Sequence, residues 1–264
     1  MKRKSIKYIQ KLKNIKKITC LTAYSVSIAK ILDKHVDIIL IGDSVGTVIY
    51  GMKNTQSVTL DMMMNHGRTV SNASKNAHTI IDMPYKTYRN KKEALNNAKK
   101  LLNFTKCQSV KLEIDEKNAD IVKYLTEKKI TVVSHIGINP QQFKNFRKIR
   151  YVGRNEKEKE NLFNLALKLE SFGSALILLE CVEENLSKKI SKYLKIPTIG
   201  IGASKECDGQ VLVTNDILET EQNSKKPKFI KSYTKLSKNI EKAVVKYCKD
   251  VVTKKFPKKK NTYN

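Results

Sequence analysis

The sequence predicts an α/β protein that folds as a single-domain (β/α)₈ barrel, the TIM-barrel architecture. Short apolar, β-branched runs alternate with longer segments of helical periodicity, and eight such runs occur along 264 residues. Strands that are apolar along nearly their whole length are typical of a parallel sheet with both faces covered. Eight strand–helix units favour a closed barrel, for which about 250 residues in one domain is usual.

The predicted elements follow one another without a repeat or a long linker. Strands are expected at residues 18–22, 36–41, 79–81, 109–112, 131–134, 175–179, 197–199 and 211–213. Helices are expected at residues 27–33, 60–70, 92–104, 119–128, 159–172 and 184–193, with a last helix at about 237–249. The polar segments 141–150 and 219–228 are expected to be loops.

The two ends of the chain are predicted to lie outside the barrel, which is assigned residues 18–252. Residues 1–17 are basic, and Ile6, Ile9 and Leu12 recur at helical spacing, which predicts a short amphipathic helix packed on the barrel. We expect neither a signal peptide, which needs roughly 7–15 consecutive apolar residues, nor a membrane helix of about 20. Residues 253–264 are lysine-rich and predicted to be a disordered tail.

The cysteines indicate a reducing compartment. Their number, five, is odd, and no C-x-x-C spacing occurs. A disulfide framework or a zinc ribbon is therefore not expected, and a cytoplasmic location is. Each cysteine is interpreted as a small buried apolar residue.

The formal net charge of +27 raises the alternative of a nucleic-acid-binding protein. The lysines, however, are scattered over nearly every segment and accompany abundant Asn and Ile, the residues that an AT-rich genome accumulates. Compositional drift explains the charge without a partner, so nucleic acid is not the expected ligand.

Polar residues, and in one case glycines, lie at the carboxyl ends of the predicted strands. Lys111 and Glu113 flank the end of the strand at 109–112, and the others follow their strands: Asp43, Ser44, Asp82, His135, Glu180, Gly200 and Gly202. In a barrel these ends converge on the face where catalytic groups lie. Each residue alone has a structural explanation, such as an N-cap for an Asp or a packing role for a His. Several like charges at one mouth cost free energy unless a cation is present.

The candidate charged ligands are all carboxylates, namely Asp43, Asp82 and Glu113. Few carboxylates, with water and substrate completing the octahedron, are typical of Mg²⁺. A bound α-keto acid could offer its ketone and carboxylate oxygens to such an ion, which would stabilise an enolate. Glu180 is then available as the base, and Lys111 could neutralise the substrate's negative charge. A packing carboxylate and a surface ion pair are the structural alternatives for these two residues.

The motifs, taken in order, resemble the ketopantoate hydroxymethyltransferase family from about Ile18 to Val252. They are Thr22-Ala23-Tyr24, Leu40-Ile41-Gly42-Asp43-Ser44-Val45-Gly46, Asp82-Met83-Pro84, Val110-Lys111-Leu112-Glu113, Ser134-His135-Ile136-Gly137, Leu179-Glu180-Cys181-Val182, Ile199-Gly200-Ile201-Gly202-Ala203 and Asp208-Gly209-Gln210-Val211-Leu212-Val213. No single motif is decisive, but the ordered set is specific.

The resemblance implies a barrel of the phosphoenolpyruvate/pyruvate type that assembles as a homodecamer. It implies transfer of a hydroxymethyl group from 5,10-methylenetetrahydrofolate to 3-methyl-2-oxobutanoate, which gives 2-dehydropantoate in pantothenate biosynthesis. In this reading Asp43, Asp82 and Glu113 form the Mg²⁺ environment. The keto acid contacts Asp43, Ser44, Asp82 and Lys111, and Glu180 accepts the proton.

The sequence departs from the family at three places. Ser25 stands where the family usually has Asp, and two expected glycine-containing loops are replaced by Asn145-Phe146-Arg147-Lys148 and Glu219-Thr220-Glu221-Gln222. Loss of glycine removes easy access to positive φ, so altered loops are expected. The closest rival function is a Mg²⁺-dependent C–C lyase of the same superfamily, but the Lys-Lys-Cys-Gly-His signature of its isocitrate-lyase branch is absent.

Overall fold

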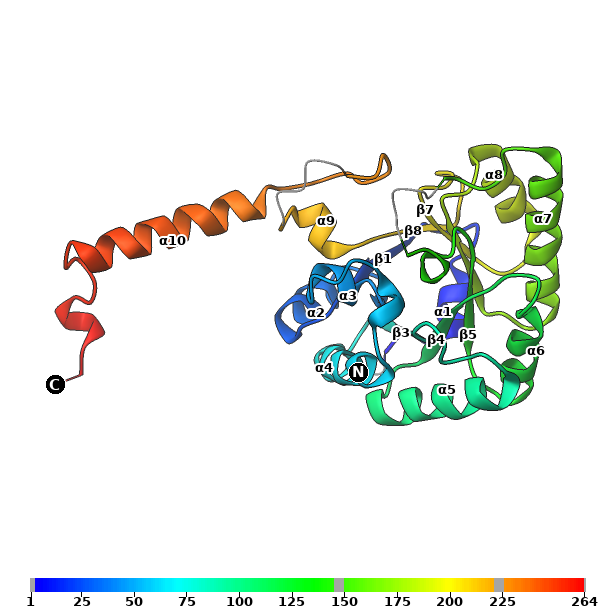
Figure 1. The fold of residues 1–264 in the computed structure, drawn as a ribbon, viewed down its shortest axis with the longest axis horizontal. Coiled ribbons are helices and arrows are strands. Elements are labelled where there is room, and N and C mark those ends of the chain that lie inside the picture. The colour runs from blue at the N-terminus through cyan, green and yellow to red at the C-terminus, as the bar shows by residue number, and fades with distance from the viewer. Residues whose placement is uncertain (1–2, 145–149, 221–225, 264) are drawn as a thin grey trace. The chain divides into compact units, whose positions relative to one another are not determined.

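A computed structural model describes residues 3–144, 150–220 and 226–263. The chain forms two compact units, Met1–Val213 and Thr214–Asn264. The first unit is a closed barrel of eight parallel strands in sequence order, with helices around it (Figure 1). The predicted (β/α)₈ fold is confirmed.

The barrel strands and helices match the predicted segments, with differences of a few residues at their ends. The strands are β1 (Ile18–Thr22), β2 (Ile38–Ile41), β3 (His78–Asp82), β4 (Ser109–Glu113), β5 (Val132–Gly137), β6 (Leu176–Glu180), β7 (Thr198–Ile201) and β8 (Gly209–Leu212). The helices are α1 (Ile6–Lys11), α2 (Val26–Leu32), α3 (Val45–Val48), α4 (Leu60–Ala73), α5 (Lys91–Thr105), α6 (Ala119–Glu127), α7 (Glu156–Ser171) and α8 (Glu184–Tyr193), with 3₁₀ turns η1 (Thr55–Ser57) and η2 (Pro140–Gln142).

Polar caps fix where the long helices begin. The side chains of Thr59, Asn90 and Asn155 each accept a hydrogen bond from a backbone N–H in the first turn of α4, α5 and α7 respectively. Such a cap satisfies one of the donors that a helix leaves unpaired at its start. Each cap therefore marks where the loop that leaves the carboxyl end of a strand stops and the helix begins.

The barrel has two apolar cores because side chains alternate along each strand. The outer core lies between strands and helices and contains residues such as Val110 and Leu112. The inner core fills the barrel with Ile38, Leu40, Ile80, Val133, Leu178 and their neighbours. Helix α1 belongs to this inner core through Ile9, which is fully buried. One end of the barrel is thereby closed by apolar packing.

The described residues contain no helix that is both long and apolar enough to cross a membrane. All five cysteines are free. Cys20, Cys107 and Cys207 are buried, as predicted, and Cys181 is half-buried. The prediction is wrong for Cys248, which is exposed because it lies on a helix that buries none of its residues.

The second unit contains α9 (Thr214–Leu218), α10 (Leu236–Val252) and the 3₁₀ turn η4 (Lys259–Asn261). Helix α10 corresponds to the predicted last helix. The predicted domain limits at residues 17 and 252, and the disordered tail, stay predictions. Of the two altered loops, residues 145–148 and 221–222 lie outside the described residues. Glu219 adopts φ 52° without a glycine, so the left-handed conformation occurs here despite the substitution.

Candidate active site

On three strands, the polar site residue occupies the next inward-facing position after an apolar side chain that fills the barrel. Ile80 precedes Asp82 by two residues, Val133 precedes His135, and Leu178 precedes Glu180. Since side chains two apart share a face of a strand, all three polar groups point to the barrel mouth. The pairing of neighbouring strands then sets Asp82 beside Lys111, and Glu113 beside His135.

The carboxylate of Asp82 joins two other predicted site residues. Its Oδ2 accepts the backbone N–H of Asp43 at 3.0 Å and lies 3.1 Å from the ammonium nitrogen of Lys111. Its other oxygen, Oδ1, is buried and has no hydrogen-bond partner among the described residues. Burial raises the pKa of Asp82 to about 7, although Lys111 opposes the rise. An unpaired, buried carboxylate oxygen is costly, so it marks a place for a cation or a donor.

A second line of contacts runs from Lys111 to Glu180. The Nζ of Lys111 lies 3.2 Å from Nδ1 of His135, and Nε2 of His135 lies 3.2 Å from Oε2 of Glu180. An ammonium group only donates, so Nδ1 must accept and the imidazole proton belongs on Nε2. Burial, and then Lys111, lower the pKa of His135, which favours this neutral form. The Nε2–Glu180 contact lacks hydrogen-bond geometry, which leaves this N–H available to a substrate.

Gln141 connects the carboxylates of Asp43 and Glu113. Its Nε2 donates to Oδ2 of Asp43 at 2.8 Å, and its backbone N–H donates to Oε2 of Glu113 at 3.0 Å. The hydroxyl of Tyr88 donates to its Oε1 at 2.5 Å. Sequence reasoning placed Gln141 in a loop and missed it. The available signal was its position, directly after Asn139-Pro140 and four residues beyond the end of β5.

Ser44 lies at the edge of this cluster. Its hydroxyl is 2.7 Å from the hydroxyl of Tyr24, which is buried. A Cβ built on Gly42 would lie 2.9 Å from the Ser44 hydroxyl and 3.6 Å from Oδ2 of Asp82. A side chain at Gly42 would therefore crowd the Ser44 hydroxyl and contact the Asp82 carboxylate. Ser25, by contrast, is exposed at the start of α2, where its hydroxyl lies 3.3 Å from that of Ser27.

The buried carboxyl groups of this cluster outnumber its buried ammonium group. Burial raises the pKa of Asp43 and holds that of Glu113 well above its usual range, with the Asp43 charge adding to the second shift. Burial acts to lower the pKa of Lys111, but the attraction of Asp82 and Asp43 outweighs it and keeps the ammonium charged. Among the residues that the structure describes here, one cation, Lys111, therefore faces three buried carboxyl groups. A divalent cation would relieve this imbalance.

The arrangement fits Mg²⁺ better than a metal enclosed by protein. Among the described residues no group of three or more His, Cys, Asp or Glu side chains is set to hold a metal ion. What the site offers is the unpaired oxygen of Asp82 beside Asp43, with oxygen donors only. Mg²⁺ is commonly held by one or two carboxylates, while water and substrate occupy the other positions.

Comparison with known proteins shows the family of the chain. Residues 3–259 match the family described as ketopantoate hydroxymethyltransferase. The chain belongs to the ketopantoate hydroxymethyltransferase family. The 3-methyl-2-oxobutanoate hydroxymethyltransferase of Pelagibacter ubique is 46% identical over 263 residues and covers 100% of both chains. That of Rhizobium etli is 42% identical over 256 residues, or 97% of this chain and 93% of the relative.

Solved structures show the same barrel at much lower identity. A 2,3-dimethylmalate lyase of the PEP mutase/isocitrate lyase superfamily has a TM-score of 0.60 and 12% identity, over 78% of this chain and 80% of the other. A phosphonopyruvate hydrolase complex with oxalate and Mg²⁺ has a TM-score of 0.59 and 8% identity, over 79% and 80%. The predicted family and the barrel fold are confirmed. The ketopantoate hydroxymethyltransferase family also makes this chain a transferase, not a lyase.

Proposed function

We propose that this hydroxymethyltransferase uses Mg²⁺ and 5,10-methylenetetrahydrofolate to convert 3-methyl-2-oxobutanoate into 2-dehydropantoate. The names of the relatives support the keto acid as substrate. In the overall reaction C3 of the keto acid loses a proton and forms a new C–C bond to the one-carbon unit. Water supplies the hydroxyl oxygen, and tetrahydrofolate is released. In the proposal the product leads to pantothenate.

The unpaired Oδ1 of Asp82 next to Asp43 is the observation that carries the proposal. Asp43 and Asp82 would hold Mg²⁺, with Glu113 completing its surroundings. When bound, Mg²⁺ acts as a Lewis acid that stabilises negative charge developing on the ketone oxygen. The ammonium of Lys111, 3.1 Å from Asp82, attracts the substrate's carboxylate to the same place. The Ser44 hydroxyl offers a further polar contact to the keto acid.

Glu180 is the proposed base that removes the C3 proton. Its side chain is 20% exposed, so it can reach a substrate in the mouth, whereas Asp82 and Glu113 are almost fully buried. Nε2 of His135 lies 3.2 Å from the Glu180 carboxylate. A positioned carboxylate within reach of the proton is the geometry that general base catalysis requires.

The test is product formation by the purified chain. Incubation with the keto acid, 5,10-methylenetetrahydrofolate and Mg²⁺ should give 2-dehydropantoate, detected by mass spectrometry. Chelation by EDTA should abolish the product, and added Mg²⁺ should restore it. Product formation that persists in EDTA would contradict the metal requirement. Cleavage of 2,3-dimethylmalate without use of folate would contradict the transferase assignment.

We further propose that the protein is a homo-oligomer, with the homodecamer implied by the sequence as the expected form. Helix α10 supports an assembly because it leaves apolar side chains exposed on one face: Ile240, Val244, Tyr247 and Val251. Such a stripe at helical spacing is normally covered by a partner.

A reducing, cytoplasmic location is also proposed, because all five cysteines are free.

A further inference from the structure

The hydroxyl of Ser44 does not cap the helix that it precedes. Ser44 occupies the N-cap position of α3, where a serine oxygen commonly accepts a backbone N–H of the first turn. Within the described part of the chain, its side chain makes no such hydrogen bond. It lies instead 2.7 Å from the hydroxyl of Tyr24, which is 5% exposed, and Ser44 itself is half-buried. The two side chains form a hydroxyl pair at the edge of the candidate active site.

The backbone of Tyr24 is held as well. Its carbonyl lies 2.8 Å from Nδ1 of His66, and because a carbonyl only accepts, Nδ1 is the donor. In the neutral imidazole Nε2 then accepts from the hydroxyl of Tyr50 at 3.0 Å. Ser44 precedes α3 and Tyr50 follows it, so Tyr24 is connected to both ends of this short helix. The position of the Tyr24 phenol relative to Ser44 is therefore fixed by two independent contacts.

The Tyr24 phenol keeps its proton at neutral pH. Burial raises its pKa, and hydrogen bonds with Ser44 and Thr22 oppose this rise only in part. The negative charges of Asp82 and Asp43 raise the pKa of the phenol further. A protonated phenol can donate one hydrogen bond while its oxygen accepts another. Tyr24 can therefore act as a donor to Ser44 and still accept from Thr22.

A bound keto acid would decide which member of the pair donates. The geometry of the pair alone allows either oxygen to be the donor. The carboxylate and ketone oxygens of a keto acid only accept, so Ser44 must give its single hydrogen to them. The Ser44 oxygen can then only accept from Tyr24. Because a hydroxyl that accepts a hydrogen bond becomes a stronger donor, this order strengthens the contact between Ser44 and the substrate.

We propose, on the basis of the proposed function in which Ser44 contacts the keto acid, that Tyr24 is a positioning residue for this substrate. Its phenol donates to the Ser44 hydroxyl and so directs the Ser44 hydrogen to an oxygen of the keto acid. The motif Thr22-Ala23-Tyr24 thereby acquires a role in substrate binding. Tyr24 acts only through Ser44, so its effect should vanish when the Ser44 hydroxyl is absent.

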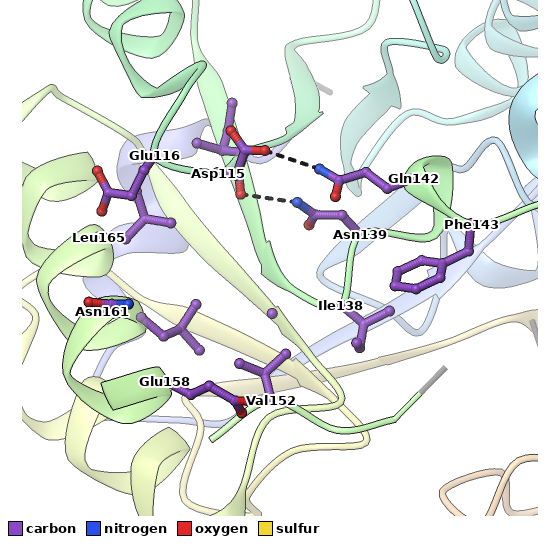
Figure 2. A pocket seen from close by; sticks show the side chains of 13 residues that line it. Asp115, Glu116, Ile138, Asn139, Gln142, Phe143, Val152, Glu158, Asn161 and Leu165 are labelled. Carbon is purple, nitrogen blue, oxygen red and sulfur yellow. Dashed lines mark hydrogen bonds between the residues drawn. The ribbon is translucent and has the colours of Figure 1, made fainter. Parts of the chain in front are cut away.

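A cavity of about 340 Å³ is a different place in which a small ligand could bind. It lies between α7 and the segments that follow β4 and β5 (Figure 2). Among the described residues its lining includes Ile138 and Phe143, but neither Tyr24 nor Ser44. The candidate active site suits an anionic keto acid better, because it contains the ammonium group of Lys111. A keto acid in the cavity would bind equally well without the Ser44 hydroxyl.

A double-mutant cycle tests the proposal. Tyr24→Phe keeps the buried ring and removes only its hydroxyl, and Ser44→Ala removes the hydroxyl of its partner. In calorimetric titrations with Mg²⁺ present, the Kd for 3-methyl-2-oxobutanoate should rise about fivefold in Tyr24→Phe and about tenfold in Ser44→Ala. The double variant should bind like Ser44→Ala alone, because the two hydroxyls act as one unit. Mg²⁺ affinity without the keto acid should be unchanged in all three variants.

The control is Tyr193→Phe, which removes an exposed hydroxyl from α8 and should leave the Kd at the wild-type value. Additive losses in the double variant would make Tyr24 a packing residue and overturn the inference. An unchanged Kd in either single variant would overturn it as well. Failure of the wild type to bind the keto acid in the presence of Mg²⁺ would instead defeat the proposed function.

Discussion

The backbone N–H of Asp43 donates to the carboxylate of Asp82 at 3.0 Å, across 39 residues of sequence. This hydrogen bond orients the Asp82 carboxylate so that one oxygen is held by Asp43 and Lys111 while the other stays unpaired. This hydrogen bond thus connects the carboxyl ends of β2 and β3, where the two proposed metal ligands, Asp43 and Asp82, lie. The contact explains why the metal and the keto acid should depend on the same side chain.

Asp82→Ala should weaken Mg²⁺ and keto-acid binding together, each by at least tenfold, because both are proposed to need this carboxylate. Calorimetric titration of Mg²⁺, and of the keto acid in its presence, measures the two effects. Asp61→Ala is the control, since the Asp61 side chain is 80% exposed. Unchanged Mg²⁺ affinity in Asp82→Ala would remove Asp82 from the metal site.

Glu180→Gln should slow exchange of the substrate's C3 proton with solvent by about 10²–10⁴-fold, the usual effect of losing a general base. Keto-acid binding should persist because Asp43, Asp82 and Lys111 are untouched. Exchange in deuterated water is followed by proton NMR without folate, which isolates this step. Exposed Glu184 in the next helix gives the matched control, Glu184→Gln. A normal exchange rate in Glu180→Gln would assign the base elsewhere.

Gln141→Leu should reduce C3 proton exchange by at least tenfold, because the Asp43 carboxylate loses the side-chain donor that orients it, while the backbone N–H that binds Glu113 remains. Stability should fall by about 1–3 kcal/mol, since buried acceptors lose their donor. Thermal unfolding and the exchange assay measure the two effects separately. The neighbouring exposed residue gives the control, Gln142→Leu, in which exchange should be normal. Equal exchange in the two variants would make Gln141 a packing residue only.

His78 should make the fold less stable in acid. It is 1% exposed, its Nδ1 lies 3.0 Å from the carbonyl of Lys4, and its Nε2 lies 2.7 Å from the Ser109 hydroxyl. A carbonyl only accepts, so Nδ1 donates to Lys4, and Nε2 accepts from Ser109. Burial lowers the pKa of His78 to about 4, from 6.5 in the unfolded chain.

Because the folded pKa is the lower one, stability is complete above about pH 6.5 and is lost as the pH falls toward 4. The loss between pH 7 and pH 5 should be about 2 kcal/mol. Urea unfolding of the wild type and His78→Gln at both pH values measures it as a difference between the two proteins. Exposed His35 gives the control, His35→Gln. Parallel pH profiles for the wild type and His78→Gln would contradict the prediction.

Val244→Asp should reduce the size of the oligomer, because it places a charge in the exposed apolar stripe of α10. Sedimentation velocity at fixed protein concentration measures the change. Lys242→Gln alters the net charge by the same amount, off the stripe, and should leave the oligomer intact. An unchanged oligomer in Val244→Asp would show that α10 is not part of the interface.

Much of the fold follows from local patterns in the chain. The β-branched runs predict the strands, and the 3.6-residue periodicity between them predicts the long helices. The polar residues at the strand ends predict that the active site lies at the barrel mouth. The short helix α3 and turn η1 were not predicted, because four or fewer residues carry too little periodicity to reveal them. Cys248 was placed in a core because its residue type is usually buried, which says nothing about its actual neighbours.

The sequence by itself determined which residues can face the barrel mouth, because alternation along a strand is a local property of the backbone. Only the tertiary structure decided which of them meet. Gln141 lies 98 residues from the Asp43 carboxylate that it binds, and the Asn139 amide is fixed by a carbonyl 25 residues away. Such pairs depend on how loops from different strands pack over the barrel end, and neither residue type nor spacing encodes that packing.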